Sequence, residues 1–376
     1  MQLRVNEQIG TGGFSIVYEA TTPEGKLVAL KLSHVTKDVE YPLLLHEACA
    51  LSLLAGHPSI PSVHAWGRSQ YFEYLTLDRL GAPVSNSVKE HNPMNLETVL
   101  LLLDQMLDSL EHLHSRDLIH RDIKPDNFLF GLGEDSGRIH LIDYGFAQYY
   151  RDPTTHLHCA LSADHEFVGT GQYASRHAHL GLSLSRRGDL ESLAYSIAFL
   201  LRGSLPWSSI KGATHRNKQD RIREKKMNWS GKRIFEGFPQ VFADFTDYVR
   251  GLRYDENPDY KHWRVVFLQL FHDLGFSSSD ESFDGAFASR GGTTEQVITT
   301  AAATSQKSAA LPPVSMGDYV LVQIIPRLTL EGQDDDDTSR WHDPTFSDPH
   351  WQFPARPALI RGVSPGKGDL KGLFIL

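Results

Sequence analysis

Cysteine is scarce in this chain. Only Cys49 and Cys159 occur among its 376 residues, and they lie far apart in the sequence. Two such residues exclude a disulfide framework and a cysteine-based zinc cluster. Low cysteine usage is typical of proteins in reducing compartments, so we expect a cytoplasmic or nuclear location.

Long hydrophobic runs and an overall positive charge are also missing. No stretch of about 18 uninterrupted apolar residues occurs, so no membrane span is expected. The opening stretch, MQLRVNEQIG, has no apolar run of the kind found in signal peptides. The formal net charge is −9, so direct binding of nucleic acid is not expected. Hydrophobic residues make up 40% of the chain, which is enough for a sizeable core.

Composition divides the chain near residue 276. Residues 1–276 are rich in aromatics and periodic apolar patterns, whereas Ser, Thr, Ala and Gly predominate immediately after them. We therefore predict one domain over residues 1–276, and a low-complexity linker with a largely disordered tail over residues 277–376. The tail contains one strand-like stretch, DYVLVQIIPRL, and an acidic DDDD run. Neither indicates a function.

Strand patterns come early in the domain and helical patterns come late. In KLVALKLS, alternation places Val28, Leu30 and Leu32 on one strand face. Apolar spacings of three and four predict a helix over Asn95–Ser115. NFLFG and RIHLIDYG read as short strands joined by a turn rich in Gly and Asp. This order predicts an α+β fold with two lobes, covering about residues 1–80 and 81–276.

A glycine-rich stretch, IGTGGFSIVYEA, opens the first lobe at residues 9–20. Its glycines allow backbone amides to approach a polyanion closely, although an ordinary glycine-rich hairpin has the same composition. Lys31 follows on the next strand and can offer an ammonium to phosphates; the alternative is a solvated strand lysine. The candidate nucleotide-contacting residues here are Ile9, Gly10, Gly12, Gly13, Val17, Ala29 and Lys31.

An acidic residue interrupts the apolar helical stretch LLLHEACALSLL. Glu47 there is either a surface residue of a half-buried helix or a partner of Lys31. In the second case it would hold the ammonium where it can contact phosphate oxygens. An acid within an apolar helix calls for a partner, which favours the pair.

Charged residues crowd into HRDIKPDNFLFG at 120–131, and HLIDYG follows at 140–145. Phosphoryl transfer requires a carboxylate for the attacking hydroxyl, a cation at the phosphoryl group and hard oxygen ligands for magnesium. Asp122 and Lys124 fit the first two needs, and Asn127 with Asp143 fits the third. A polar turn between two strands would explain the charges but not their order.

The chain resembles eukaryotic protein kinases, and within them it is similar to casein kinase I. The resemblance covers about residues 3–276 and rests on HRDIKPDNFLFG, IDYGFAQYYRDPTTH, LRGSLPWSSIKGATHRNKQDRIREKKM and LRYDENPDY. It also rests on GTGQYASRHAHLGLSLSRRGDLESLAY, whose YAS at 173–175 stands where most kinases have Ala-Pro-Glu. It implies a two-lobed kinase fold, with a small β-rich N-lobe and a larger helical C-lobe. It also implies a monomer that transfers the γ-phosphoryl group of ATP, with Mg²⁺, to Ser or Thr of protein substrates.

The resemblance assigns roles to single residues. It makes Asp122 the catalytic aspartate and Lys124 its phosphate-steadying neighbour, with Lys31 and Glu47 as an ion pair. The remaining roles are magnesium ligands at Asn127 and Asp143, a gatekeeper at Leu77, an adenine-binding hinge at Leu80 and a brace of the catalytic loop at Asp189.

Three departures from the family pattern stand out. Ser15 replaces the usual third glycine, and few residues precede the first strand, so we expect an incomplete sheet edge. Gln172 stands where the family carries an arginine, which with the lysine at Lys218 forms an anion site for already phosphorylated substrates. Because glutamine lacks the charge and the two-pronged guanidinium, we expect a weaker preference for acidic or primed substrates.

The residues alone leave open two alternatives to an active protein kinase. A pseudokinase or scaffolding module would keep the fold without efficient transfer, but every catalytic position is filled. A phosphotransferase acting on small molecules shares the Asp and Asn pattern, and the stretch from Gly169 to Trp207 argues against it. The basic run from Arg216 to Lys226 is either a solvated helix face or a surface for substrate anions or nuclear import.

Overall fold

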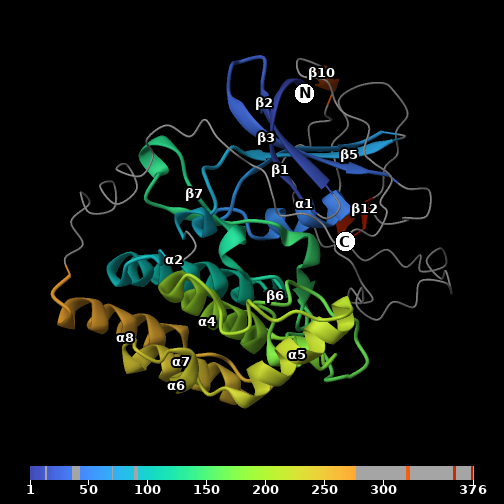
Figure 1. Cartoon of the computed structure of the whole chain (residues 1–376). Helices are drawn as coiled ribbons and strands as arrows, with labels where there is room; N and C mark the ends of the chain where they lie inside the picture. The colour runs from blue at the N-terminus through green and yellow to red at the C-terminus, as the bar shows by residue number, and fades with distance from the viewer. Residues whose placement is uncertain are drawn as a thin grey trace.

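The protein has a β-rich part and a helical part, as the computed structural model in Figure 1 shows. No helix among the described residues is long and apolar enough to cross a membrane. The structure describes residues 1–12, 15–35, 43–69, 71–88 and 92–276, and three short strands at 319–321, 359–360 and 374–375. The domain boundary near residue 276 stays a prediction, and the predicted disorder of the tail lies outside the described residues.

The first part is a six-stranded sheet in the order β10-β1-β2-β3-β5-β4. All five of its N-terminal strands pair antiparallel with their neighbours. Helix α1 packs against strands β4 and β5. The elements are β1 (Gln2–Thr11), β2 (Ser15–Thr21), β3 (Leu27–His34), α1 (Leu43–Leu53), β4 (Val63–Arg68), β5 (Phe72–Asp78) and β10 (Tyr319–Leu321).

Strand β3 has the predicted alternation. Val28, Leu30 and Leu32 are buried and pack in one cluster with residues of β1 and β2, which confirms the apolar face. The expected incomplete sheet edge is wrong, because β1 pairs with β2 on one side and with β10 on the other. Residues near the end of the chain therefore cover an edge that the N-terminal residues alone would leave open.

The helical part is built around α2, which begins at Leu96, one residue after the predicted start at Asn95, and ends at Ser115 as predicted. Its preceding residue, Asn95, accepts a hydrogen bond from the Thr98 N–H at 2.7 Å and so caps the helix. The buried face of α2 packs against α4 and α8 in the largest hydrophobic cluster. The helices are α2 (Leu96–Ser115), α3 (Arg176–His179), α4 (Arg186–Arg202), α5 (His215–Asn228), α6 (Gly231–Ile234), α7 (Gln240–Gly251) and α8 (Tyr260–Asp273).

Short hairpins and turns lie between the two parts and carry the motif residues. The predicted strands of NFLFG and RIHLIDYG are present as a hairpin in which Phe128 pairs with Leu141. These elements are η1 (Val84–Ser87), β6 (Leu118–Ile119), η2 (Pro125–Asn127), β7 (Phe128–Phe130), η3 (Gly133–Asp135), β8 (Ile139–Leu141), η4 (Tyr144–Phe146) and β9 (Gln148–Tyr149). Two further short strands, β11 (Leu359–Ile360) and β12 (Phe374–Ile375), pair with each other.

Candidate active site

Three charged side chains from distant parts of the chain meet at one point. The Lys31 ammonium on β3 donates to Glu47 Oε2 on α1 at 2.7 Å and to Asp143 Oδ1 at 3.0 Å. Glu47 is buried within α1, so the predicted partner for this acid is present and the surface alternative is wrong. The solvated-lysine alternative for Lys31 is wrong as well, because its side chain is only 15% exposed.

The three groups shift one another's pKa. Burial alone would lower the pKa of Lys31, but the carboxylates of Glu47 and Asp143 raise it above its ordinary value. Burial raises the pKa of Glu47, with the Lys31 charge acting against this effect. For Asp143, burial is outweighed by the Lys31 ammonium, so its pKa is lowered. The ammonium and the Asp143 carboxylate are therefore held in their charged forms.

The loop of residues 120–127 is braced from below by a buried carboxylate. Asp189 on α4 accepts from the backbone N–H groups of His120, at 2.7 Å, and Arg121, at 2.9 Å. Arg121 has a left-handed backbone, with φ of 70°, a conformation that costs energy for a residue with a side chain. These two charge-assisted hydrogen bonds, which the Asp189 carboxylate accepts, hold the loop in this shape, as the resemblance implies for Asp189.

Asp122 and Lys124 form a second charged pair on the same loop. The Lys124 ammonium donates to Asp122 Oδ2 at 2.6 Å and to the Thr170 hydroxyl at 2.9 Å. The other carboxylate oxygen, Oδ1, accepts from the Thr170 N–H at 2.8 Å. Both oxygens of Asp122 are thus oriented, and its position depends on a turn 48 residues further along the chain.

Asn127 and Asp143 lie at corresponding ends of the β7–β8 hairpin. The Asn127 carbonyl accepts from the Ile142 N–H at 2.9 Å, which fixes the two segments side by side. The Asn127 amide nitrogen donates to the Asp122 carbonyl at 2.8 Å, so the amide oxygen is the atom left to act as a ligand. One amide oxygen and one carboxylate fit Mg²⁺, which shares its remaining ligand positions with phosphates and water.

The nucleotide-contacting residues predicted on β2, β3 and β5 share one sheet face. Val17 pairs with Lys31, and Ala29 pairs with Leu77, in the cross-strand register. Paired residues, and residues two apart on a strand, point to the same side of a sheet. Val17, Ala29, Lys31 and Leu77 therefore lie on the face that carries the Lys31–Glu47 pair.

The glycine-rich hairpin is described except at its tip. Gly10 pairs with Val17, next to Ile9 on β1, and the Gly12 N–H donates to the Ser15 carbonyl at 2.7 Å. The departure at Ser15 is therefore accommodated inside a closed hairpin, where Ser15 is buried at the start of β2. Gly13 lies outside the described residues.

Leu80 follows β5 at the junction of the two parts. Its neighbour Arg79 is not among the residues predicted from the sequence. The Arg79 guanidinium donates to the Leu80 carbonyl and to Glu19 Oε2. These contacts fix the backbone at the position that the resemblance assigns to adenine binding.

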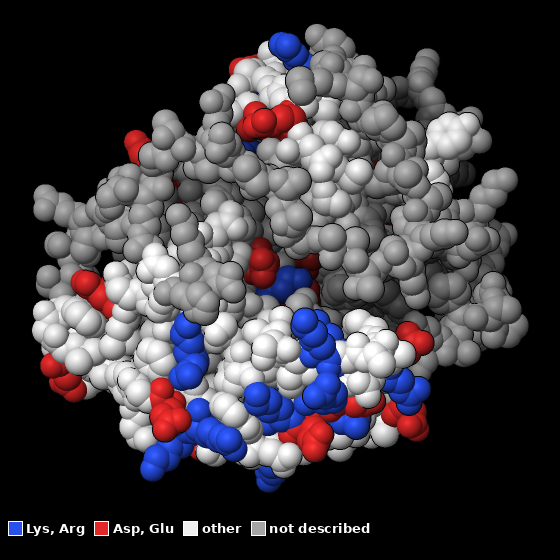
Figure 2. Space-filling view, viewed as in Figure 1, with Lys and Arg blue, Asp and Glu red and all other residues white. Residues whose placement is uncertain are grey.

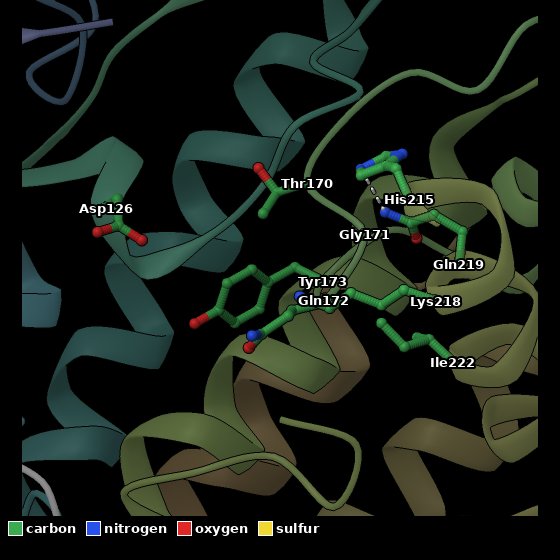
Figure 3. A pocket seen from close by; sticks show the side chains of 9 residues that line it. All are labelled: Asp126, Thr170, Gly171, Gln172, Tyr173, His215, Lys218, Gln219 and Ile222. Atoms are coloured by element: carbon green, nitrogen blue, oxygen red, sulfur yellow. Dashed lines mark hydrogen bonds between the residues drawn. The ribbon is translucent and has the colours of Figure 1, made fainter. Parts of the chain in front are cut away.

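Gln172 and Lys218, the two residues expected to form an anion site, line the same cavity. This cavity of about 400 Å³ lies beside the Asp122 loop and is drawn in Figure 3. Gln172 is anchored: its carbonyl accepts from Trp207 Nε1 at 2.8 Å and its side-chain oxygen from the Ser208 hydroxyl at 3.3 Å. Asp126, at the opposite end in Figure 3, adds a negative charge to the lining.

Helix α5 carries the basic run, and neither interpretation of that run holds for all of it. Lys226 is buried, with its ammonium on the carbonyls of Gly171 and Ala174, so it belongs to neither a solvated face nor an anion surface. Lys225 donates to the Pro206 carbonyl. Figure 2 shows other Lys and Arg side chains gathered on this face of the helical part.

Residues 3–256 match a family model described as "Protein kinase domain". The matched segment contains the glycine-rich hairpin, both charged pairs and the cavity described above.

Proposed function

This chain belongs to the protein kinase family, and from that premise we propose that it is an active serine/threonine kinase of the casein kinase I type. The proposal rests on two groups of ion pairs. Lys31 contacts both Glu47 and Asp143, and Lys124 contacts Asp122. Phosphoryl transfer depends mainly on positioning and on charge stabilisation, and these two clusters supply both.

The chain's own residues account for each task in the transfer. We assign the N–H of Leu80 to the adenine ring, the face of Val17, Ala29 and Leu77 to its packing, and the Gly10–Gly12 backbone to the phosphates. Lys31 would steady the phosphate oxygens, since Glu47 and Asp143 fix its ammonium in place. A substrate hydroxyl attacks the γ-phosphorus as the bond to the ADP oxygen breaks. Asp122 accepts the hydroxyl proton, and Lys124 stabilises the moving phosphoryl group.

Mg²⁺ would be held by the amide oxygen of Asn127 and the carboxylate of Asp143. When bound, it supplies positive charge that neutralises the phosphate oxygens of ATP. The Asn127 side chain is already oriented by its hydrogen bond to the Asp122 carbonyl.

The decisive experiment compares the parent with Asp122→Asn on a protein substrate such as casein. We expect phosphate incorporation by the parent and a loss of at least about a hundredfold in the variant, because a general base contributes about that much. ATP binding, measured separately, should be equal in the two proteins. If the parent binds ATP but transfers nothing, the scaffolding alternative is correct.

The cavity beside the Asp122 loop supports a reduced preference for primed substrates. Lys218 is the lysine expected there, but Gln172 brings no charge and its side-chain oxygen is engaged by Ser208. Asp126 adds a carboxylate to the same lining, which opposes a doubly charged phosphate. We therefore propose that the substrates are acidic or already phosphorylated proteins. The preference for them over neutral, unphosphorylated proteins should be weaker than it would be with an arginine at position 172.

Gln172→Arg tests this substrate preference. The new guanidinium should raise the rate ratio of a phosphorylated peptide over its unphosphorylated twin by about tenfold, since a charge-assisted, two-pronged contact replaces a neutral one. Adding Lys218→Met to the Gln172→Arg variant should lower this rate ratio again, because it removes the other positive charge of the cavity. A parent ratio that already equals that of Gln172→Arg would contradict the proposal.

The location and assembly of the chain belong to the proposal as well. Cysteine usage favours a cytoplasmic or nuclear enzyme, and both charged clusters lie within one chain, so a monomer suffices for activity. Size-exclusion chromatography with light scattering tests the second point.

A further inference from the structure

Lys226 is a fully buried lysine on an otherwise charged helix. Its relative exposure is 0%, and its ammonium donates to the carbonyls of Gly171, at 2.9 Å, and Ala174, at 2.6 Å. It also lies over the rings of Tyr195, at 4.7 Å, and Trp207, at 5.2 Å. No carboxylate among the described residues forms an ion pair with it.

A buried amine in this position is not explained by stability. Removing a lysine from water is costly, and apolar residues of similar volume often replace buried charges without loss of stability. What Lys226 supplies, and an apolar residue cannot, is a set of hydrogen-bond donors aimed at backbone carbonyls. Both carbonyls belong to a single turn, residues 170–174, and a third contact, with His179 Nε2 at 3.3 Å, lies on α3.

This turn connects the catalytic loop to the substrate cavity. The Thr170 N–H donates to Asp122 Oδ1, and the Thr170 hydroxyl accepts from Lys124. The turn is closed by the N–H groups of Tyr173 and Ala174, which both donate to the Thr170 carbonyl. Further along the same turn, Gln172 and Tyr173 line the cavity (Figure 3).

The carbonyls of the turn accept hydrogen bonds from two side chains, Trp207, which follows α4, and Lys226 on α5. Trp207 Nε1 donates to the Gln172 carbonyl at 2.8 Å, so Lys226 and Trp207 together bind three carbonyls of the turn, those of Gly171, Gln172 and Ala174. Both side chains also contact Tyr195, whose hydroxyl donates to the buried Glu191 at 2.5 Å. Lys226 and Trp207 are thus packed against buried residues of α4.

We propose that Lys226 is a positioning residue that holds the 170–174 turn, and through it sets both the Asp122 carboxylate and the substrate cavity. The expected effect on catalysis rests on the proposed kinase activity. The expected effect on the 170–174 turn does not depend on it. Losing the two hydrogen bonds should let the turn move, because the contact of His179 Nε2 with the Gly171 carbonyl, at 3.2 Å, does not reach the Ala174 end of the turn.

The test compares the parent, Lys226→Met and the exposed-lysine control Lys232→Met. In Lys226→Met we expect kcat/KM for a protein or peptide substrate to fall roughly tenfold to a hundredfold, since small misplacements of reacting groups cost that much. KM for ATP and the melting temperature should stay close to the parent values. Amide hydrogen exchange should accelerate in residues 170–174 and not elsewhere. Lys232→Met should match the parent in every measurement.

Each outcome separates the possibilities. Unchanged exchange at 170–174 in folded Lys226→Met overturns the inference, whatever its activity. If Lys226→Met does not fold, Lys226→Gln keeps a donor, and global unfolding of both variants overturns it in favour of a purely structural lysine. If the parent transfers no phosphate but exchange rises locally in Lys226→Met, the proposed function fails and the positioning role stands.

Discussion

Single residues in this protein act through partners distant in the sequence, and His46 is an example. It precedes Glu47 on α1, and its Nε2 lies 2.8 Å from the Ala147 carbonyl, just beyond the turn that follows Asp143. Burial lowers the pKa of His46 to about 4, and the Arg121 charge acts in the same direction. The neutral ring therefore links the helix that carries Glu47 to the segment that carries Asp143.

The pH dependence of stability should report this ring. Between pH of about 6.5 and about 4 the unfolded chain binds a proton at His46 and the folded chain does not, so the free energy of unfolding falls as pH falls. His46→Gln cannot take up the proton, and it should reduce the loss across this window by about 1 to 3 kcal/mol relative to the parent. Urea titrations at a series of pH values measure the difference.

The exposed residue His262, replaced by Gln, serves as the control for this titration. Parallel curves for the parent and His46→Gln would mean that the His46 ring titrates normally in the folded protein.

At the scale of elements, the sequence predicted best what depends on local periodicity. The alternation of β3, the helix beginning after Asn95 and the β7–β8 hairpin are all present, because each is set by neighbouring residues and by one buried face. Lys226 was grouped with a charged run because its burial depends on Tyr195 and Trp207, which the sequence does not place beside it.

The cap of α2 gives an element-scale prediction. Replacing Asn95 by Ala removes the acceptor of the Thr98 N–H and should lower the free energy of unfolding by about 1 kcal/mol. Kinetic constants should change little, because the cap lies at the end of the helix away from the catalytic loop. The exposed Asn228 at the end of α5, replaced by Ala, caps no helix start and should cost much less. Equal losses in the two variants would contradict the capping role.

At the scale of the whole molecule, a strand from the C-terminal segment pairs with the first strand of the chain. Residues 2–4 of β1 pair with residues 319–321 of β10, although more than 300 positions separate them in sequence. The strand-like stretch in the tail was recognised from its composition, but its place at the sheet edge was not, since strand pairing between distant segments leaves no local pattern.

Val320→Pro tests this pairing in the full chain. Proline has no N–H and is poorly tolerated within a paired strand, so the substitution should release β10 from β1. Hydrogen exchange of β1 amides that face β10 should accelerate about tenfold or more. Ala303→Pro, a change outside the described residues, controls for a proline elsewhere in the tail. Unaltered exchange in β1 would show that the edge does not depend on this strand.

The arrangement of Lys31, Glu47 and Asp143 is held by ion pairs among these three side chains themselves. In the following segment, the backbone N–H groups of Thr154 and Thr155 and the Thr155 hydroxyl donate to the carboxylate of Asp152, which would repel a phosphate added to either threonine. The kinase that we propose would therefore need no phosphorylation by an upstream kinase to form this charged site. Its output would then be set by how much of it the cell makes, where it is kept, and which substrates come within reach.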